Sequence, residues 1–187
     1  MILNSRASSF YFVFPKGFFP ESVVDKYMPY VKSLQTPFDT LTQFMNSTIQ
    51  SINFPGMSIG STQQTRYLGK KVVYKDATPV QDLFNQDFTV SFRMTDGFIN
   101  YWIMLDTVLN FQNFKNEQPY IPTLPLRFLN SEGDILVTNN FENVIISSIS
   151  DVQLNYTQNS PQVSTFTVGF KSNFMHIQLH MDQKVTG

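Results

Sequence analysis

Alternation of apolar and polar residues is the strongest pattern in this chain. It is clearest over residues 88–95, where Phe88, Val90, Phe92 and Met94 alternate with Thr89, Ser91, Arg93 and Thr95. Successive side chains of a strand point to opposite faces, so the pattern predicts a strand with one buried and one polar face. The same alternation occurs at residues 151–156 and 165–171. Residues 158–161 between them are typical of a turn, which predicts an antiparallel hairpin.

Further strands are expected where apolar, β-branched and aromatic residues form short runs between turn residues. These runs cover residues 10–14, 52–59, 66–75, 124–129 and 135–138. Residues 130–134 form a polar segment with a glycine, which predicts a turn between the last two strands.

One helix is predicted after Asp96, a residue type that caps helix N-termini well. It places Phe98, Trp102, Leu105 and Leu109 on one face, and we expect that face to pack against a sheet.

Two more helices are expected within residues 20–50. The first carries Val23, Val24, Tyr27 and Val31 and should be broken or kinked at Pro29. The second should start with Thr36 as its cap and Pro37 at its first position, with an apolar stripe of Phe38, Leu41, Phe44 and Met45. Together they predict a helical insertion near the N-terminus, at about residues 15–49, inside one domain that spans residues 1–187.

These elements predict a mainly β fold, an antiparallel sandwich or barrel with one packed helix and that insertion. Only 14% of the 187 residues are charged, against a usual share of about a quarter. Nineteen phenylalanines accompany this low charge. The combination suits a self-assembling protein, although an ordinary aromatic core with an amide-rich surface explains the composition equally well.

Charge and cysteine content exclude several kinds of protein. A net charge of -1 argues against a basic nucleic-acid clamp, so contact with DNA should be passive. The chain has no cysteine, which excludes disulfides and thiolate catalysis. It also shows no apolar secretory signal and no stretch long enough to span a bilayer, so we expect cytoplasmic synthesis and no membrane partner.

No motif predicts an enzyme, a cofactor or a metal site. His176 and His180 would lie about 13 Å apart on one face of a strand. If the segment were helical they would lie one turn apart, yet no third ligand has a suitable spacing. Glu132 and Asp134 could bind calcium or do acid/base chemistry, but their place in a turn explains them more simply.

A basic cluster is formed by Arg66, Lys70, Lys71 and Lys75. It could meet an acidic surface on a neighbouring subunit or on nucleic acid. Equally, it could be a solvated edge strand whose lysines discourage aggregation.

The order of segments resembles the tail-tube proteins of contractile-tailed bacteriophages and, more distantly, the Hcp tube protein of type VI secretion. The matching features are the first strand, the turn Phe54-Pro55-Gly56, an extended hairpin over residues 66–96, the helix after it, and the closing strand Ser164-Thr165-Phe166-Thr167-Val168-Gly169-Phe170. The insertion at residues 15–49 is unmatched. The chain could therefore be a tube subunit or a related initiator, terminator or neck-ring protein.

The resemblance implies a hexameric ring with a shared inner β-barrel, stacked into a virion tail that conducts DNA without binding it specifically and is assembled in the host cytoplasm. Sheath, baseplate or neck proteins would be the other partners. The subunit interface implied for this sequence consists of Arg66, Lys70, Lys71, Val73, Lys75, Thr78, Pro79, Phe84, Thr89 and Arg93. The main alternative is a monomeric β-barrel that holds a small apolar ligand.

Overall fold

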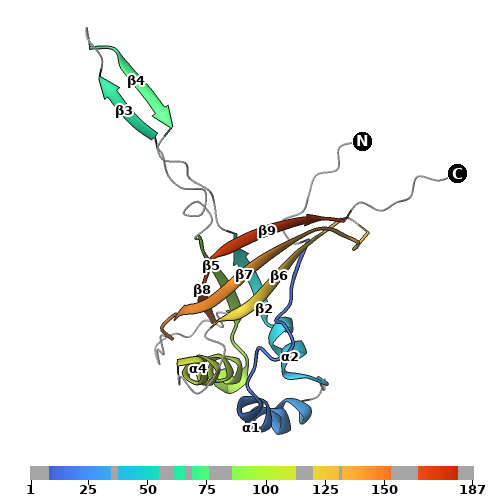
Figure 1. Cartoon of the computed structure of the whole chain (residues 1–187). Coiled ribbons are helices and arrows are strands. Elements are labelled where there is room, and N and C mark those ends of the chain that lie inside the picture. The colour runs from blue at the N-terminus through green and yellow to red at the C-terminus, as the bar shows by residue number, and fades with distance from the viewer. Residues whose placement is uncertain are drawn as a thin grey trace, which may run out of the picture.

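The computed structural model of the chain describes residues 9–34, 38–54, 61–65, 69–75, 86–112, 120–130, 132–152 and 164–180 (Figure 1). Its strands are β1 Phe10–Phe12, β2 Ile49–Asn53, β3 Ser61–Thr65, β4 Lys71–Lys75, β5 Gln86–Arg93, β6 Ile121–Leu129, β7 Ile135–Ile149, β8 Thr165–Ser172 and β9 Phe174–Leu179. Its helices are α1 Glu21–Lys32, α2 Leu41–Ser47 and α4 Ile99–Gln112, and the 3-10 turn η2 Asp96–Phe98 precedes α4. The predicted mainly β, antiparallel fold with helices is confirmed.

Seven strands form one antiparallel sheet in the order β1-β6-β7-β8-β5-β2, and β9 also pairs with β7. β7 is the 15-residue strand that joins the two halves of this sheet. Its first part pairs with β6 and β9, and its last part, Ile145 to Ile149, pairs with β8. Figure 1 shows α1, α2 and α4 on one side of the sheet.

Phenylalanine rings fill the space on the helix side of the sheet. The register places Phe88 of β5 opposite Phe170 of β8 and Phe92 opposite Phe166. These two pairs are stacked, with ring centroids 5.2 and 5.1 Å apart. Phe88 also stacks on Phe141 of β7 at 4.1 Å. The predicted alternation along β5 is confirmed, because Phe88, Val90 and Phe92 are all buried.

The insertion begins with an aromatic cluster centred on Phe14. Its ring contacts those of Phe12, Phe18, Phe19 and Phe92, which links the first strand to the sheet core. Helix α1 follows and continues through Pro29 to Lys32, so the helix is not broken at Pro29, and the kink expected as the alternative stays a prediction.

Helix α2 begins later than the sequence suggested. Thr40 is its N-cap, and the Thr40 hydroxyl accepts a hydrogen bond of 3.2 Å from the Gln43 backbone N–H. The expected start at Thr36 and Pro37 falls on residues outside the described part. Phe38 precedes the helix, whereas Leu41, Phe44 and Met45 form the buried face as predicted.

Helix α4 packs through a different face from the predicted one. Trp102 and Leu109 are 47% and 53% exposed, and the buried residues are Asn100, Ile103, Met104 and Thr107. The cause lies at the helix start, where Gly97 and Phe98 have positive φ angles and the α-helix begins only at Ile99. The Asp96 side chain does not cap the helix. Instead, the side-chain oxygen Oδ1 of Asn100 accepts a hydrogen bond from the Thr95 N–H at 3.2 Å, and Asn100 Nδ2 donates one to the Arg93 carbonyl at 2.7 Å. These bonds hold Asn100 in the interior, so the helix buries a different face from the predicted one.

One predicted hairpin is wrong, because residues 66–96 do not form a single hairpin: β4 pairs with β3, while β5 pairs with β2 and β8. The other predicted hairpin lies largely outside the described residues. The antiparallel strand that precedes β8 is Ile145–Ile149 of β7, and the Ser150 N–H also donates to the Thr167 carbonyl at 2.9 Å, whereas residues 151 and 152 are not in a strand. The remainder of the predicted strand and its turn, residues 153–163, lies outside the described residues. Strand β2 covers residues 49–53 and so overlaps the strand expected at residues 52–59 only at residues 52–53, and residues 55–59 are not described.

Candidate assembly surface

The β3–β4 hairpin is the first component of this surface. β3 pairs with β4 from Ser61↔Lys75 to Thr65↔Lys71, and within the described residues neither strand joins the seven-stranded sheet. All five side chains of β3 are exposed. Figure 1 shows the hairpin standing away from the sheet and helices. An isolated two-stranded hairpin has marginal stability in water, so this element needs a further partner.

One face of the hairpin has an apolar residue at its centre, with polar and positively charged residues around it. Val73 is 59% exposed and pairs directly with Gln63, so these two side chains share a face. Lys71, two residues from Val73, lies on the same face and is also exposed. Such a face can contribute an apolar contact, an amide pair and a positive charge to one interface.

The predicted interface residues fall into two separate groups. Lys70, Lys71, Val73 and Lys75 belong to or adjoin β4, where Lys70 and Lys71 are exposed. Thr89 and Arg93 lie in β5 of the large sheet. The structure does not pair these two strands. The other four predicted residues, Arg66, Thr78, Pro79 and Phe84, lie outside the described part, so their role stays a prediction.

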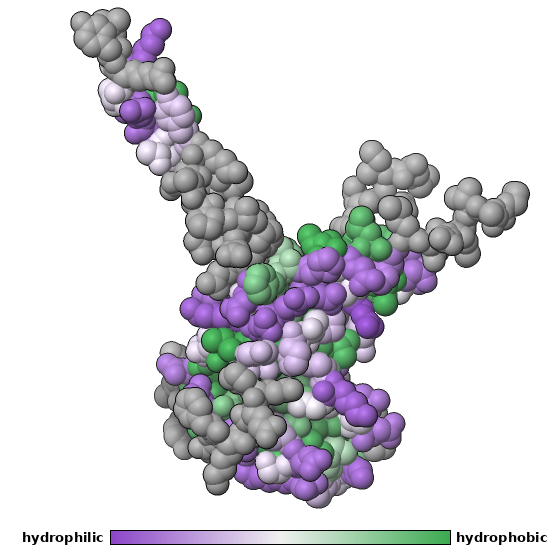
Figure 2. Space-filling view, viewed as in Figure 1, coloured by the Kyte–Doolittle hydropathy of each residue, from purple (hydrophilic) through white to green (hydrophobic). Residues whose placement is uncertain are grey.

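The face of the sheet opposite the phenylalanine core is rich in hydroxyl groups. Cross-strand neighbours on this face are Asp87↔Lys171, Thr89↔Gly169, Ser91↔Thr167 and Arg93↔Thr165. The exposed Asp87 and Lys171 form an ion pair of 3.6 Å, so their charges cancel locally. Figure 2 shows a band of hydrophilic residues across the sheet above the helices, in the region that Figure 1 labels β7, β8 and β9. Arg93 adds an exposed cation, so the arrangement offers hydrogen bonds and one unbalanced positive charge among these four pairs.

The end of the sheet at β1, β6, β7 and β9 carries apolar side chains that remain uncovered. Across these strands, Phe10, Phe128, Val137 and Leu179 form one row, and Phe12, Leu126, Asn139 and Ile177 form the next. Ile177 and Leu179 are 56% and 62% exposed. Strand β9 was not predicted from the sequence. A period-two pattern could have revealed it, because the apolar Met175, Ile177 and Leu179 alternate with the polar His176, Gln178 and His180.

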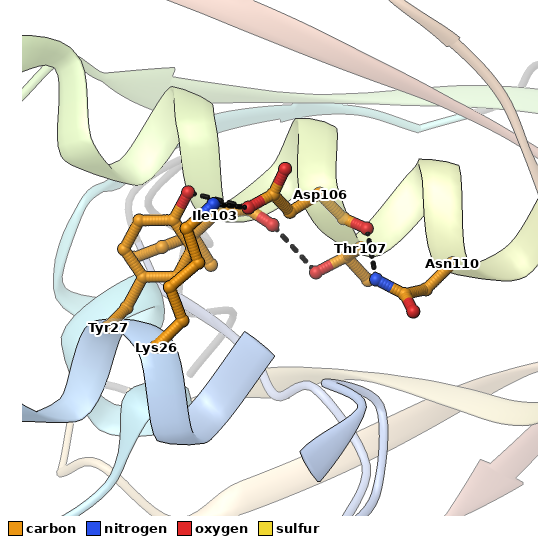
Figure 3. Close-up of polar contacts among 6 residues, drawn as sticks. All are labelled: Lys26, Tyr27, Ile103, Asp106, Thr107 and Asn110. Carbon is orange, nitrogen blue, oxygen red and sulfur yellow. Dashed lines mark hydrogen bonds and ion pairs between the residues drawn. The ribbon is translucent and has the colours of Figure 1, made fainter. Parts of the chain in front are cut away.

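The insertion is attached to α4 by one polar cluster (Figure 3). Lys26 Nζ donates to Asp106 Oδ2 at 2.6 Å, and Tyr27 Oη donates to the same oxygen at 2.7 Å. These hydrogen bonds, the one from Lys26 first, hold the pKa of the Asp106 carboxyl below its ordinary value. The hydrogen bond to Asp106 in turn raises the pKa of Lys26, whereas the pKa of Tyr27 is raised mainly by burial.

The two histidines and the two turn carboxylates considered as candidate chemical groups lie in ordinary strand and turn positions. His176 lies in the extended strand β9, and His180 Nε2 lies 2.8 Å from Thr138 Oγ1. Asn130 Oδ1 accepts from the N–H groups of Glu132 and Asp134 at 2.8 Å each, which confirms the predicted turn. In the described part of the chain, no group of three or more metal-ligating side chains could hold an ion. No described helix is long and apolar enough to cross a membrane.

No protein-family model and no curated protein matches the sequence. Solved structures with a similar fold do exist. The anti-feeding prophage cap, a tube-terminating cap, matches with a TM-score of 0.55 and 12% identity, over 96% of this chain and 94% of that chain. The six-fold symmetrised anti-feeding prophage baseplate matches with a TM-score of 0.53 and 11% identity, over 95% of this chain and 97% of that chain.

A crystal structure of Hcp is more distant, with a TM-score of 0.37 and 13% identity over 71% of this chain and 76% of that chain. The two structures with a TM-score above 0.5 are thus a tube-terminating cap and a baseplate of the anti-feeding prophage. The resemblance to tail-tube proteins that the sequence indicated is confirmed at the level of the fold.

Proposed function

We propose that this chain is a structural, non-enzymatic subunit that assembles with copies of itself into a ring of the tube of a phage tail or a related contractile injection particle. The observation that carries the proposal is the β3–β4 hairpin, which projects from the body with all of β3 exposed. A strand pair without a core of its own is stabilised when a neighbouring subunit covers it.

The ends of the large sheet support the same function. β1 and β2 are its terminal strands, and each has one pairing neighbour within the described residues. Terminal strands present unpaired backbone groups, and closure of sheets around a ring of subunits removes such edges. The baseplate structure with a similar fold was symmetrised six-fold, and six copies are accordingly the proposed ring size here.

We place the subunit at an end or junction of the tube. The similarity to the tube-terminating cap extends over 96% of this chain, so it includes the helical insertion that the tail-tube resemblance left unmatched. The baseplate similarity extends equally far. On this proposal the partners are the adjacent tube ring and a cap, baseplate or neck protein. Contact with a sheath and a virion location remain predictions.

The hydroxyl-rich sheet face is the proposed lining of the ring. Thr89, Ser91, Thr165 and Thr167 offer neutral groups there, and the Asp87–Lys171 pair cancels its own charge. A protein that grips nucleic acid places several cations against phosphates. On this face Arg93 is the one cation of these four β5–β8 pairs without a paired carboxylate among them, so the lining lacks such a cluster and lets DNA pass without specific binding.

The alternative of a monomeric ligand-binding barrel has less support. Its apolar cavity would have to lie on the side of the sheet where Phe88, Phe141 and Phe170 stack on one another. Within the described residues the sheet also stays open, because β1 and β2 pair with β6 and β5 and not with each other.

Native mass spectrometry of the purified chain over a range of concentrations tests this function. We expect a complex of six copies, or multiples of six when rings stack. A chain that remains a monomer at every concentration would contradict assembly as its function.

A further inference from the structure

Asn139 has a buried amide without a hydrogen-bond partner. The residue is 1% exposed, and neither Oδ1 nor Nδ2 forms a hydrogen bond. Its cross-strand neighbours are Leu126 of β6 and Ile177 of β9, so apolar side chains flank it on both sides. Buried polar groups are nearly always paired in finished structures. An unpaired amide of this kind indicates a partner that the isolated chain lacks.

Apolar residues, some buried and some exposed, surround this amide. The ring of Phe54, which is exposed, lies 5.9 Å from the ring of Phe128 and 6.2 Å from that of Phe141. Phe54 therefore bridges the rows on either side of Asn139. We call Phe54, Asn139, Ile177 and Leu179 the amide strip. Next to it, the turn between β6 and β7 carries the exposed carboxylates of Glu132 and Asp134.

The occupant of this strip must satisfy three conditions. It must bring an apolar side chain to cover Ile177 and Leu179, and a group that both donates and accepts a hydrogen bond to pair with the Asn139 amide. It must also bring a cation to the carboxylates of the adjacent turn. On one face of the β3–β4 hairpin, Val73, Gln63 and Lys71 meet these conditions in the same order.

We propose that the β3–β4 hairpin of a second copy of this chain docks on the amide strip. Val73 covers Ile177 and Leu179, the Gln63 amide pairs with that of Asn139, and Lys71 lies beside Glu132 and Asp134. Phe54 turns aside to admit Gln63. The inference rests on the proposed function and specifies which surface of one subunit receives the hairpin of the next.

The two surfaces are different parts of the molecule, and this determines the kind of assembly. In Figure 1 the hairpin points away from the end of the sheet where β6, β7 and β9 meet. Contacts between two unlike surfaces are heterologous, and such contacts close into rings or continue as stacks. Each copy then uses its hairpin on one neighbour and its amide strip on the other.

Cross-linking between two single-cysteine variants tests the contact, because the natural chain has no cysteine. Val73→Cys and Ile177→Cys are mixed, allowed to assemble and treated with a short bis-maleimide. We expect a cross-linked dimer in the mixture. The matched control is Leu109→Cys on α4, which has a similar exposure of 53% and should give no product with Val73→Cys. A product of Ser5→Cys with Ile177→Cys in place of the hairpin product would assign the strip to the N-terminal residues and overturn the proposal.

The unpaired amide supplies a second, independent test. Asn139→Leu removes the unpaired polar group, so the melting temperature of the monomer should rise, while the concentration needed for assembly should increase about tenfold because the Gln63 pair is lost. Asn46→Leu is the control, since Asn46 Oδ1 is also buried and unpaired but lies in α2. It should leave the assembly concentration unchanged.

The outcomes separate this inference from the proposed function. Complexes that form normally with Asn139→Leu and give no product between Val73→Cys and Ile177→Cys would overturn the docking site and leave ring assembly in place. A natural chain that does not assemble at all would overturn the proposed function as well.

Discussion

Two buried side-chain amides, those of Asn100 and Asn139, differ in whether they form hydrogen bonds. Asn100 is fully buried and pairs through both ends of its amide, with the backbone of Thr95 and of Arg93. Asn139 is equally buried and pairs through neither end. The first amide fixes the start of α4 within the chain. The second is expected to find its partner in another subunit.

At the same scale, Phe14 should be a critical core residue. Its buried ring contacts four other phenylalanine rings and connects the insertion to the sheet. Phe14→Ala should lower the free energy of unfolding by about 3–5 kcal/mol, because it removes apolar contacts and leaves a cavity. Urea denaturation measures this change. Phe174→Ala, at an exposed position, should cost far less, and equal losses would contradict this role of Phe14.

The Asp106 carboxylate should give part of the stability a defined pH dependence. Its lowered pKa means that the folded state binds this proton less readily than the unfolded chain, in which the ordinary value is 3.8. Its contribution is therefore complete above that value and is lost as the pH falls through the lowered folded pKa. Asp106→Asn should cost about 1 kcal/mol at neutral pH, and the difference from the natural chain should shrink below about pH 4.

Unfolding free energies measured from pH 7 to pH 3 test this prediction. Asp25→Asn is a suitable control, because Asp25 is exposed on α1 and forms no side-chain hydrogen bond with any described residue. A difference between the natural chain and Asp106→Asn that stays constant down to pH 3 would show that the Lys26 and Tyr27 contacts do not stabilise the ionised carboxylate.

At the scale of elements, the sequence predicted best where the apolar pattern has one interpretation. β5 and β8 alternate regularly, and their buried faces are as expected. β3 reads Ser-Thr-Gln-Gln-Thr and has no apolar residue, so no pattern could reveal it. Helix α4 has apolar residues on all sides, and only the bonds of Asn100 determine which face is buried. Pairing partners depend on contacts between distant segments, which explains why the predicted hairpin over residues 66–96 was wrong.

Removal of the β3–β4 hairpin should not destabilise the rest of the fold. Replacing residues 61–75 with a short glycine-serine linker should leave the thermal unfolding of the monomer nearly unchanged, because β3 and β4 pair only with each other among the described residues. The same deletion should abolish assembly. Differential scanning calorimetry and sedimentation velocity measure the two effects. A deletion variant that still forms complexes of the natural size would exclude the hairpin as an assembly element.

At the scale of the whole molecule, the fold divides into a packed body and surfaces that remain incomplete. Stacked phenylalanine rings and the Lys26–Asp106–Tyr27 cluster hold the helices and the sheet together. On the proposed function, the projecting hairpin, the terminal strands and the amide strip gain further contacts in a ring. The mainly β fold could be predicted from sequence, whereas the amide strip could not, because it combines Phe54, which follows β2, with residues of β7 and β9. The organisation as one domain stays a prediction.

Electron microscopy of the purified, concentrated protein is the most direct test of assembly. We expect rings or short tubes with a central hole, in which the hairpin of each subunit lies on the β7–β9 end of its neighbour. A uniform population of single compact particles, with no rings even at the highest concentration, would contradict it.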